Sequence, residues 1–145
     1  MSEINVALLH CDVADSGLLK IDRIGSGVGI IIYDKARHIG AGLHFLAPYS
    51  RDSKPHNPFM YANTAIPHAL VEINRKGGSA PFSVAVAGGA AMLKKQTEEG
   101  AGRQILEAAK EALNNSGLQI TLEETGGNSI RCMVLDIDAG KIKII

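Results

Sequence analysis

The chain has little of what several classes of protein depend on. It contains no tryptophan, three phenylalanines and three tyrosines, so a core must be filled mainly by Ile, Val, Leu and Ala. Its fifteen basic and fifteen acidic residues cancel, which leaves no overall field to concentrate a nucleic acid, an anionic membrane or an acidic substrate. Any recognition must therefore come from shaped contacts.

The sequence also lacks the usual marks of secretion, membrane insertion and a disulfide framework. Residues 1–5 have neither the basic nor the apolar region of a secretion signal, and no apolar run approaches the roughly 18 residues of a membrane span. The two cysteines, Cys11 and Cys132, are far apart and have no C-x-x-C spacing, which disfavours a disulfide or a zinc site. We expect a cytoplasmic protein with no metal or cofactor and two buried thiols.

The patterns that are present predict one α+β domain over residues 1–145. Alternating apolar residues over 4–8 predict a first strand, and the β-branched run from Val28 to Tyr33 predicts a strand covered on both faces. We further expect a hairpin partner over 38–46, a loop over 49–58, a short strand over 83–87 and a closing hairpin of strands over 130–137 and 141–145.

Two amphipathic helices are expected between these strands. Apolar residues recur at helical spacing from Ala65 to Ile73, and Pro67 would be tolerable there only in a first turn. A second set runs from Ile105 to Leu113 and ends at Gly117, in a left-handed cap position. The charged residues of this half of the chain indicate solvated helix surface: Lys94, Lys95, Glu98, Glu99, Lys110 and Glu111.

Five short signatures stand in order along the chain. They are Ile24-Gly25-Ser26-Gly27-Val28, Gly42-Leu43-His44-Phe45-Leu46-Ala47-Pro48, Tyr61-Ala62, Ala87-Gly88-Gly89-Ala90, and Glu124-Thr125-Gly126-Gly127 with Arg131. In content and spacing, from about Leu19 to Lys143, the chain resembles the chemoreceptor glutamine deamidase family CheD. Five signatures in register make this resemblance more specific than any one of them.

The resemblance implies a fold, a chemistry and partners. The fold is α+β, a mixed β-sandwich with flanking helices, related to that of the deamidating cytotoxic necrotizing factor toxins. In the family, the cysteine of a G-S-C segment attacks a glutamine carboxamide, the histidine of an H-x-x-x-P segment is the base and a threonine helps to hold the site. The implied partners are methyl-accepting chemotaxis receptors and a CheC-type phosphatase.

This sequence departs from the family pattern at the decisive positions. His44 stands at the base position, but the nucleophile position holds Gly27 and the threonine position holds Ile21. Loss of the nucleophile in triad hydrolases costs on the order of 10⁶ in turnover. The sequence therefore predicts a CheD-like pseudoenzyme that acts by binding. The resemblance places the rest of its pocket at Ser26, Tyr61, Gly88, Gly89, Gly126 and Gly127.

Three alternatives remain open at this point. Cys11 could serve as a displaced nucleophile in a working protein-glutamine deamidase, whereas Ser26 should not, because neighbours on a strand point to opposite faces. The volume left by a missing side chain at Gly27, next to an apolar Ile21, could instead hold a small ligand. A deliberate replacement of the nucleophile is the third alternative, and the accompanying change at position 21 argues against it.

Other patterns support less specific interpretations. His44 could be a strand histidine whose ring nitrogens are satisfied locally. His10, Cys11 and Asp12 are a weak metal-site candidate, since only the first and third would share a face of a strand. The glycines from Gly25 to Gly29 resemble a phosphate-binding loop, but a β-branched strand follows them where such loops lead into a helix, so we expect no nucleotide.

Overall fold

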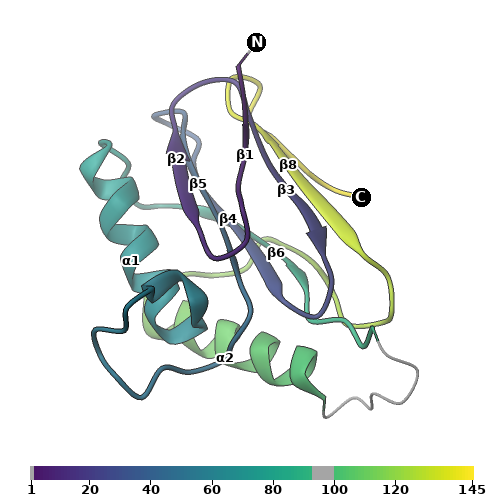
Figure 1. Ribbon diagram of the computed structural model, residues 1–145. Helices are drawn as coiled ribbons and strands as arrows, with labels where there is room; N and C mark the ends of the chain where they lie inside the picture. The colour runs from purple at the N-terminus through teal and green to yellow at the C-terminus, as the bar shows by residue number, and fades with distance from the viewer. Residues whose placement is uncertain (1, 93–99) are drawn as a thin grey trace.

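The computed structural model describes residues 2–92 and 100–145 and arranges them in three layers (Figure 1). A four-stranded sheet has the order β1 (Glu3–Asn5), β3 (Leu18–Ile24), β8 (Arg131–Asp136), β9 (Lys141–Ile144). A five-stranded sheet has the order β2 (Cys11–Ala14), β5 (Ile39–Phe45), β4 (Val28–Asp34), β6 (Ser83–Gly88), β7 (Leu122–Thr125). One face of the five-stranded sheet packs against the four-stranded sheet. Its opposite face carries α1 (Ala62–Arg75), preceded by the 3-10 turn η1 (Pro58–Met60), and α2 (Ala101–Asn115).

This architecture confirms the expected α+β fold, a mixed β-sandwich with flanking helices. The pairs β1–β3 and β6–β7 are parallel and the other strand pairs are antiparallel. Neither helix in the described part of the chain has the length and apolar character to cross a membrane. Four of the charged residues assigned to helix surface, Lys94, Lys95, Glu98 and Glu99, lie outside the described residues.

Strand β4 shows why the three layers stack. All of its residues are buried, as its β-branched run predicts. Because alternate residues of a strand face opposite sides, Ile30 and Ile32 pack into the core beneath the helices, whereas Ile31 and Tyr33 pack into the core between the sheets. The domain therefore has two apolar cores, separated by the five-stranded sheet.

The N-terminal region differs most from the sequence-based prediction. The strand expected over 4–8 is reduced to β1, and β3 was not predicted. In β3, Leu19 and Ile21 alternate inward, but a bulge then shifts the register, so that Ile24 is the next buried residue. Arg23, within this bulge, has a positive φ of 55°. A pattern search with a strict period of two fails at such a bulge, because one extra residue inverts the alternation.

Helix α1 begins earlier than predicted, so Pro67 lies in its interior and the expectation of a first-turn proline is wrong. The start has no sequence signal, because Tyr61 makes no side-chain capping bond within the described residues. Backbone pairing places it instead, since the Ala62 N–H donates to the Ala47 carbonyl at 3.0 Å. Helix α2 ends as predicted: Gly117 has a φ of 73°, and the Leu118 N–H donates to the Leu113 carbonyl at 2.9 Å.

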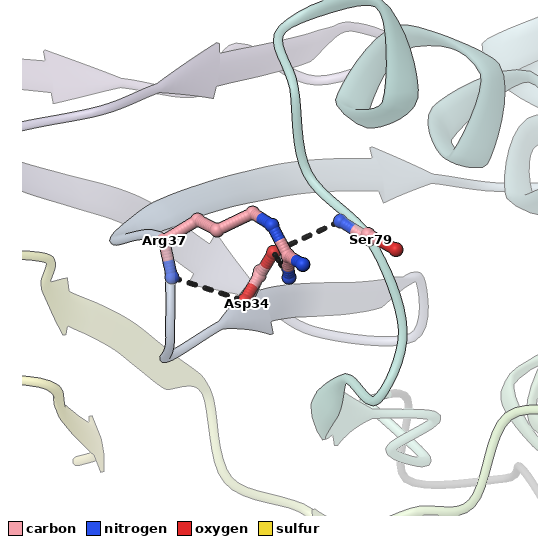
Figure 2. A network of polar contacts seen from close by, with 3 residues as sticks. All are labelled: Asp34, Arg37 and Ser79. Carbon is pink, nitrogen blue, oxygen red and sulfur yellow. Dashed lines mark hydrogen bonds and ion pairs between the residues drawn. The ribbon is translucent and has the colours of Figure 1, made fainter.

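A buried carboxylate fixes the turn between β4 and β5 (Figure 2). Asp34 is 1% exposed and accepts hydrogen bonds from the Ser79 N–H at 2.9 Å and from Arg37 Nη1 at 3.0 Å. Burial by itself would raise the pKa of Asp34, but the bonds from Ser79 and Arg37 outweigh it and hold this pKa below its usual value. The network ties the hairpin to the segment after α1, at the end of β4 opposite to Gly27.

Candidate functional site

The Gly25–Gly27 segment lies where the chain crosses from one sheet to the other. Strand β3 ends at Ile24 in the four-stranded sheet, and β4 begins at Val28 in the five-stranded sheet. The crossing is held by the segment that follows β6, because the Gly89 N–H donates to the Gly27 carbonyl at 2.9 Å and the Ala90 N–H donates to the Gly25 carbonyl at 3.1 Å. Two signatures that are distant in sequence are thus joined by their backbones.

The last glycine signature joins the same junction from the other side. The Gly126 N–H donates to the Gly88 carbonyl at 2.9 Å, and the Ala91 N–H donates to the Gly127 carbonyl at 2.8 Å. Arg131 closes this turn, because its guanidinium donates to the Gly126 carbonyl. The three glycine signatures therefore meet at one end of the sandwich, joined by backbone hydrogen bonds.

Gly88 is needed at this junction for two separate reasons. Its φ of 113° lies in a region that residues with a Cβ rarely adopt. A Cβ at this position would also collide with the carbonyl oxygen of Gly27. The close approach of β6 to the crossing segment therefore depends on the absence of a side chain at position 88.

His44 lies beside Gly27, as the resemblance implies. It belongs to β5, pairs with Gly29 of β4 and is 5% exposed. A Cβ on Gly27 would stand 3.5 Å from His44 Nε2, so a thiol carried by that carbon could reach the imidazole within hydrogen-bond distance. The structure thus brings the base position and the nucleophile position together.

The imidazole of His44 has no bonding partner in the described part of the chain. Its ring makes no hydrogen bond to any residue that the structure describes, and because no fully buried side-chain nitrogen lacks a partner there, the ring nitrogens keep some contact with solvent. Burial lowers its pKa below the ordinary value, which keeps the ring neutral and able to accept a proton near neutral pH. Its backbone is fixed, since the Leu9 N–H donates to the His44 carbonyl at 2.7 Å.

The space at Gly27 is not empty. A Cβ there would lie 2.8 Å from Leu46 Cδ2 and 2.8 Å from the Phe45 carbonyl oxygen, both closer than an ordinary contact between such atoms. The idea that this position leaves room for a small ligand therefore loses its basis. Leu46 was missed in the sequence, although it lies in the same signature as His44, because its effect depends on a contact across the sheet crossing.

Ile21 lines the space between the sheets close to His44. It is fully buried, and its Cδ1 atom would lie 3.5 Å from a Cβ at Gly42. Gly42 and His44 are two residues apart on β5 and so face the same side. Ile21 therefore presents an alkyl group on the side of the sheet that carries the imidazole, and it can supply no hydrogen bond there.

The other two predicted pocket residues lie around this site. Ser26 is half-buried in the sheet crossing and lies outside any strand, so the alternation argument used against it does not apply. Its hydroxyl has no hydrogen-bond partner in the described part of the chain. Tyr61 pairs through its backbone with Ala47, at the end of the signature that contains His44.

Cys11 cannot replace the missing nucleophile, and that hypothesis is wrong on geometric grounds. Cys11 pairs with Leu43 across β2 and β5 and packs into the core beneath the helices. His44, the next residue after Leu43, faces the opposite side of the sheet. Burial, reinforced by the nearby negative charges of Asp12 and Glu72, also raises the pKa of Cys11 to about 12, so its thiolate is scarce at neutral pH.

Cys132 is also remote from the site. It lies on the outer face of β8, and its Sγ atom donates a hydrogen bond to Asp22 Oδ1 at 2.8 Å. Burial, with this hydrogen bond second, raises the pKa of Cys132 to about 11. Both cysteines are half-buried, so the expectation of two buried thiols is only partly met. Among the described residues, no group of three or more His, Cys, Asp or Glu side chains could hold a metal ion.

A separate hollow of about 90 Å³ lies between α1 and α2. Its walls include Tyr49, Asn63, Pro67 and Glu111, and the Tyr49 hydroxyl donates to Glu111 Oε2 at 2.7 Å across its edge. The helices cover one face of the five-stranded sheet, and His44 lies on the opposite face, so the sheet stands between them. The hollow is therefore no part of the site at Gly27.

Comparison with known proteins bears on the whole chain. A family model described as CheD chemotactic sensory transduction matches residues 46–145. A Methanococcus vannielii protein named "Probable chemoreceptor glutamine deamidase CheD" is 39% identical over 123 residues, which cover 83% of this chain and 80% of that protein. Proteins of the same name from Desulforamulus reducens and Thermococcus kodakarensis are 34% and 32% identical and cover 99% and 98% of this chain, and 90% and 91% of their own lengths.

Proposed function

The chain belongs to the CheD family, and we propose that it has kept the family's fold and site architecture while losing the deamidase chemistry. Its proposed role is binding: it engages methyl-accepting chemotaxis receptors or a CheC-type phosphatase through the surface around Gly27 and His44. Its relatives are named as probable chemoreceptor glutamine deamidases, which supports receptors as the class of partner.

One observation carries the proposed loss of chemistry, namely a glycine at the position that faces the His44 imidazole. Hydrolysis of a carboxamide through an acyl intermediate needs a side chain that attacks the carbon and holds the acyl group. A neutral imidazole can accept a proton in that step but cannot replace the thiol. In triad hydrolases without their nucleophile, substrate binding and oxyanion donors leave a rate only about 10³ to 10⁴ times that of the reaction in water.

Exposed apolar side chains at the same end of the molecule support a binding role. Leu46, Met60 and Met92 are 40%, 36% and 39% exposed. The Leu46 N–H donates to the Met60 carbonyl at 3.2 Å, and Met92 Cγ would lie 3.3 Å from a Cβ at Gly25. The side chains of Leu46 and Met92 therefore border the Gly27 site, with Met60 next to Leu46 along the backbone, and neighbouring exposed apolar groups of this kind are typical of protein–protein contacts.

Calorimetric titration tests this role directly. The protein is titrated with a chemoreceptor cytoplasmic domain and, separately, with a CheC-type phosphatase, using the natural chain, Leu46→Glu and Val71→Glu. Val71 is a matched control because it is 48% exposed and lies on α1, away from Gly27. We expect the natural chain and Val71→Glu to bind at least one of the two partners. Leu46→Glu should bind at least about tenfold more weakly, because burial of its unpaired carboxylate in the interface is costly. No binding to either partner, or equal binding by all three proteins, would contradict the proposed role.

A further inference from the structure

The Gly27 position is enclosed by residues of the signature that contains His44. Of the two groups that a Cβ there would meet, the Phe45 carbonyl belongs to β5, where Phe45 pairs with Val28. It can move only if the strand pairing is disturbed. Leu46 Cδ2 is the end of a flexible side chain, so it is the removable part of the enclosure.

We propose that Leu46 partly covers the His44 imidazole and fills the place that a nucleophilic side chain would need, so that the site is obstructed as well as inert. Leu46 is 40% exposed and His44 is 5% exposed. Leu46 Cδ2 and His44 Nε2 approach the same point, the Cβ position of Gly27, at 2.8 Å and 3.5 Å. Both groups therefore border the place of a side chain at position 27, and Leu46 is the more exposed of the two.

The backbone of Leu46 is fixed, which makes it a stationary cover. Its N–H donates to the Met60 carbonyl at 3.2 Å, and the Ala47 N–H donates to the same carbonyl at 3.0 Å. Among the described residues around position 27, the Leu46 side chain is therefore the part of the enclosure that rotation alone can move. This inference draws its significance from the proposed function, but it concerns only access to His44 and to position 27.

The first test leaves position 27 unchanged. Diethyl pyrocarbonate acylates neutral imidazoles, and peptide mass mapping gives the rate at each histidine, with the exposed His56 as an internal reference. Leu46→Ala should increase the rate at His44 relative to His56 by about tenfold, because a local opening step is no longer required. Leu122→Ala, at a residue that is 37% exposed on β7, should leave this ratio unchanged. An equal ratio in the natural chain and Leu46→Ala would overturn the proposal.

A second test uses an introduced thiol. Gly27→Cys is compared with Gly27→Cys/Leu46→Ala by the rate of iodoacetamide alkylation at position 27. The native thiols give little background at neutral pH, since the pKa values of Cys11 and Cys132 are raised to about 12 and about 11. We expect about tenfold faster alkylation in the double variant, and equal rates would contradict a covering role. If Gly27→Cys does not fold, the histidine measurement still decides. Neither readout involves a receptor, so failure here and failure of the proposed binding role are distinguishable.

Discussion

Replacement of Gly88 by alanine tests whether the junction of the glycine signatures is built as described. The new Cβ would meet the Gly27 carbonyl oxygen, and the backbone would have to keep a φ of 113°. Movement of that carbonyl would also weaken the hydrogen bond that it accepts from the Gly89 N–H. The perturbation thus acts on the segment that positions Gly27 against His44.

The expected loss of stability can be estimated from these two effects. A non-glycine residue held in such a backbone region costs about 1–3 kcal/mol, and loss of one intramolecular hydrogen bond costs about 1 kcal/mol. Gly88→Ala should therefore lower the free energy of unfolding by about 2–4 kcal/mol, a large part of the roughly 5–15 kcal/mol typical of a domain.

Gly126→Ala is the matched control. Gly126 also has a positive φ, 74°, but a Cβ there would have nothing within 4 Å among the described residues. Its cost should be limited to the backbone conformation, about 1–2 kcal/mol. Urea unfolding followed by circular dichroism gives both values, provided that the slope is unchanged. If Gly88→Ala were no more destabilising than Gly126→Ala, the close contact between Gly88 and Gly27 would be refuted.

Two further predictions concern Asp34 and the restoration of chemistry. Because the pKa of Asp34 is lowered in the folded protein, its contribution to the free energy of unfolding should be present above the unfolded carboxyl pKa and lost as the pH falls through the folded value. Urea unfolding across this range should show that Asp34→Ala is about 1–3 kcal/mol less stable at neutral pH and lacks that part of the pH dependence. The same pH dependence in the variant would contradict this role of Asp34. Gly27→Cys/Ile21→Thr/Leu46→Ala should have more glutamine deamidase activity, measured by peptide mass, than Gly27→Cys/Ile21→Thr, because one of the two groups that the new side chain would meet is removed. Equal, measurable activity in the two variants would contradict the obstruction by Leu46.

Much of the fold could be predicted where local pattern and tertiary environment agree. The β-branched run from Val28 to Tyr33 is a strand buried on both faces, and the hairpin of β8 and β9 follows its alternating residues. Gly117 ends α2 because a left-handed residue there allows the capping bonds. Each of these features is encoded within a few neighbouring residues.

The features that were missed depend on contacts between distant segments. The face occupied by Cys11 follows from its pairing with Leu43, which no local pattern reveals. The start of α1 is set by a bond to Ala47. The proximity of Gly27 and His44 was expected only through a family resemblance, and the contact that Leu46 makes at position 27 is visible only in three dimensions.

The proposed loss of deamidase chemistry follows from the absence of a side chain at position 27, and an assay of ammonia release decides whether it is right. The natural chain is incubated with a chemoreceptor cytoplasmic domain that contains glutamine, and the Methanococcus vannielii relative is assayed in parallel. The account predicts no release above the rate without protein from the Gly27 chain. Release of ammonia over multiple turnovers by this chain, abolished by His44→Ala, would contradict the proposed loss of chemistry.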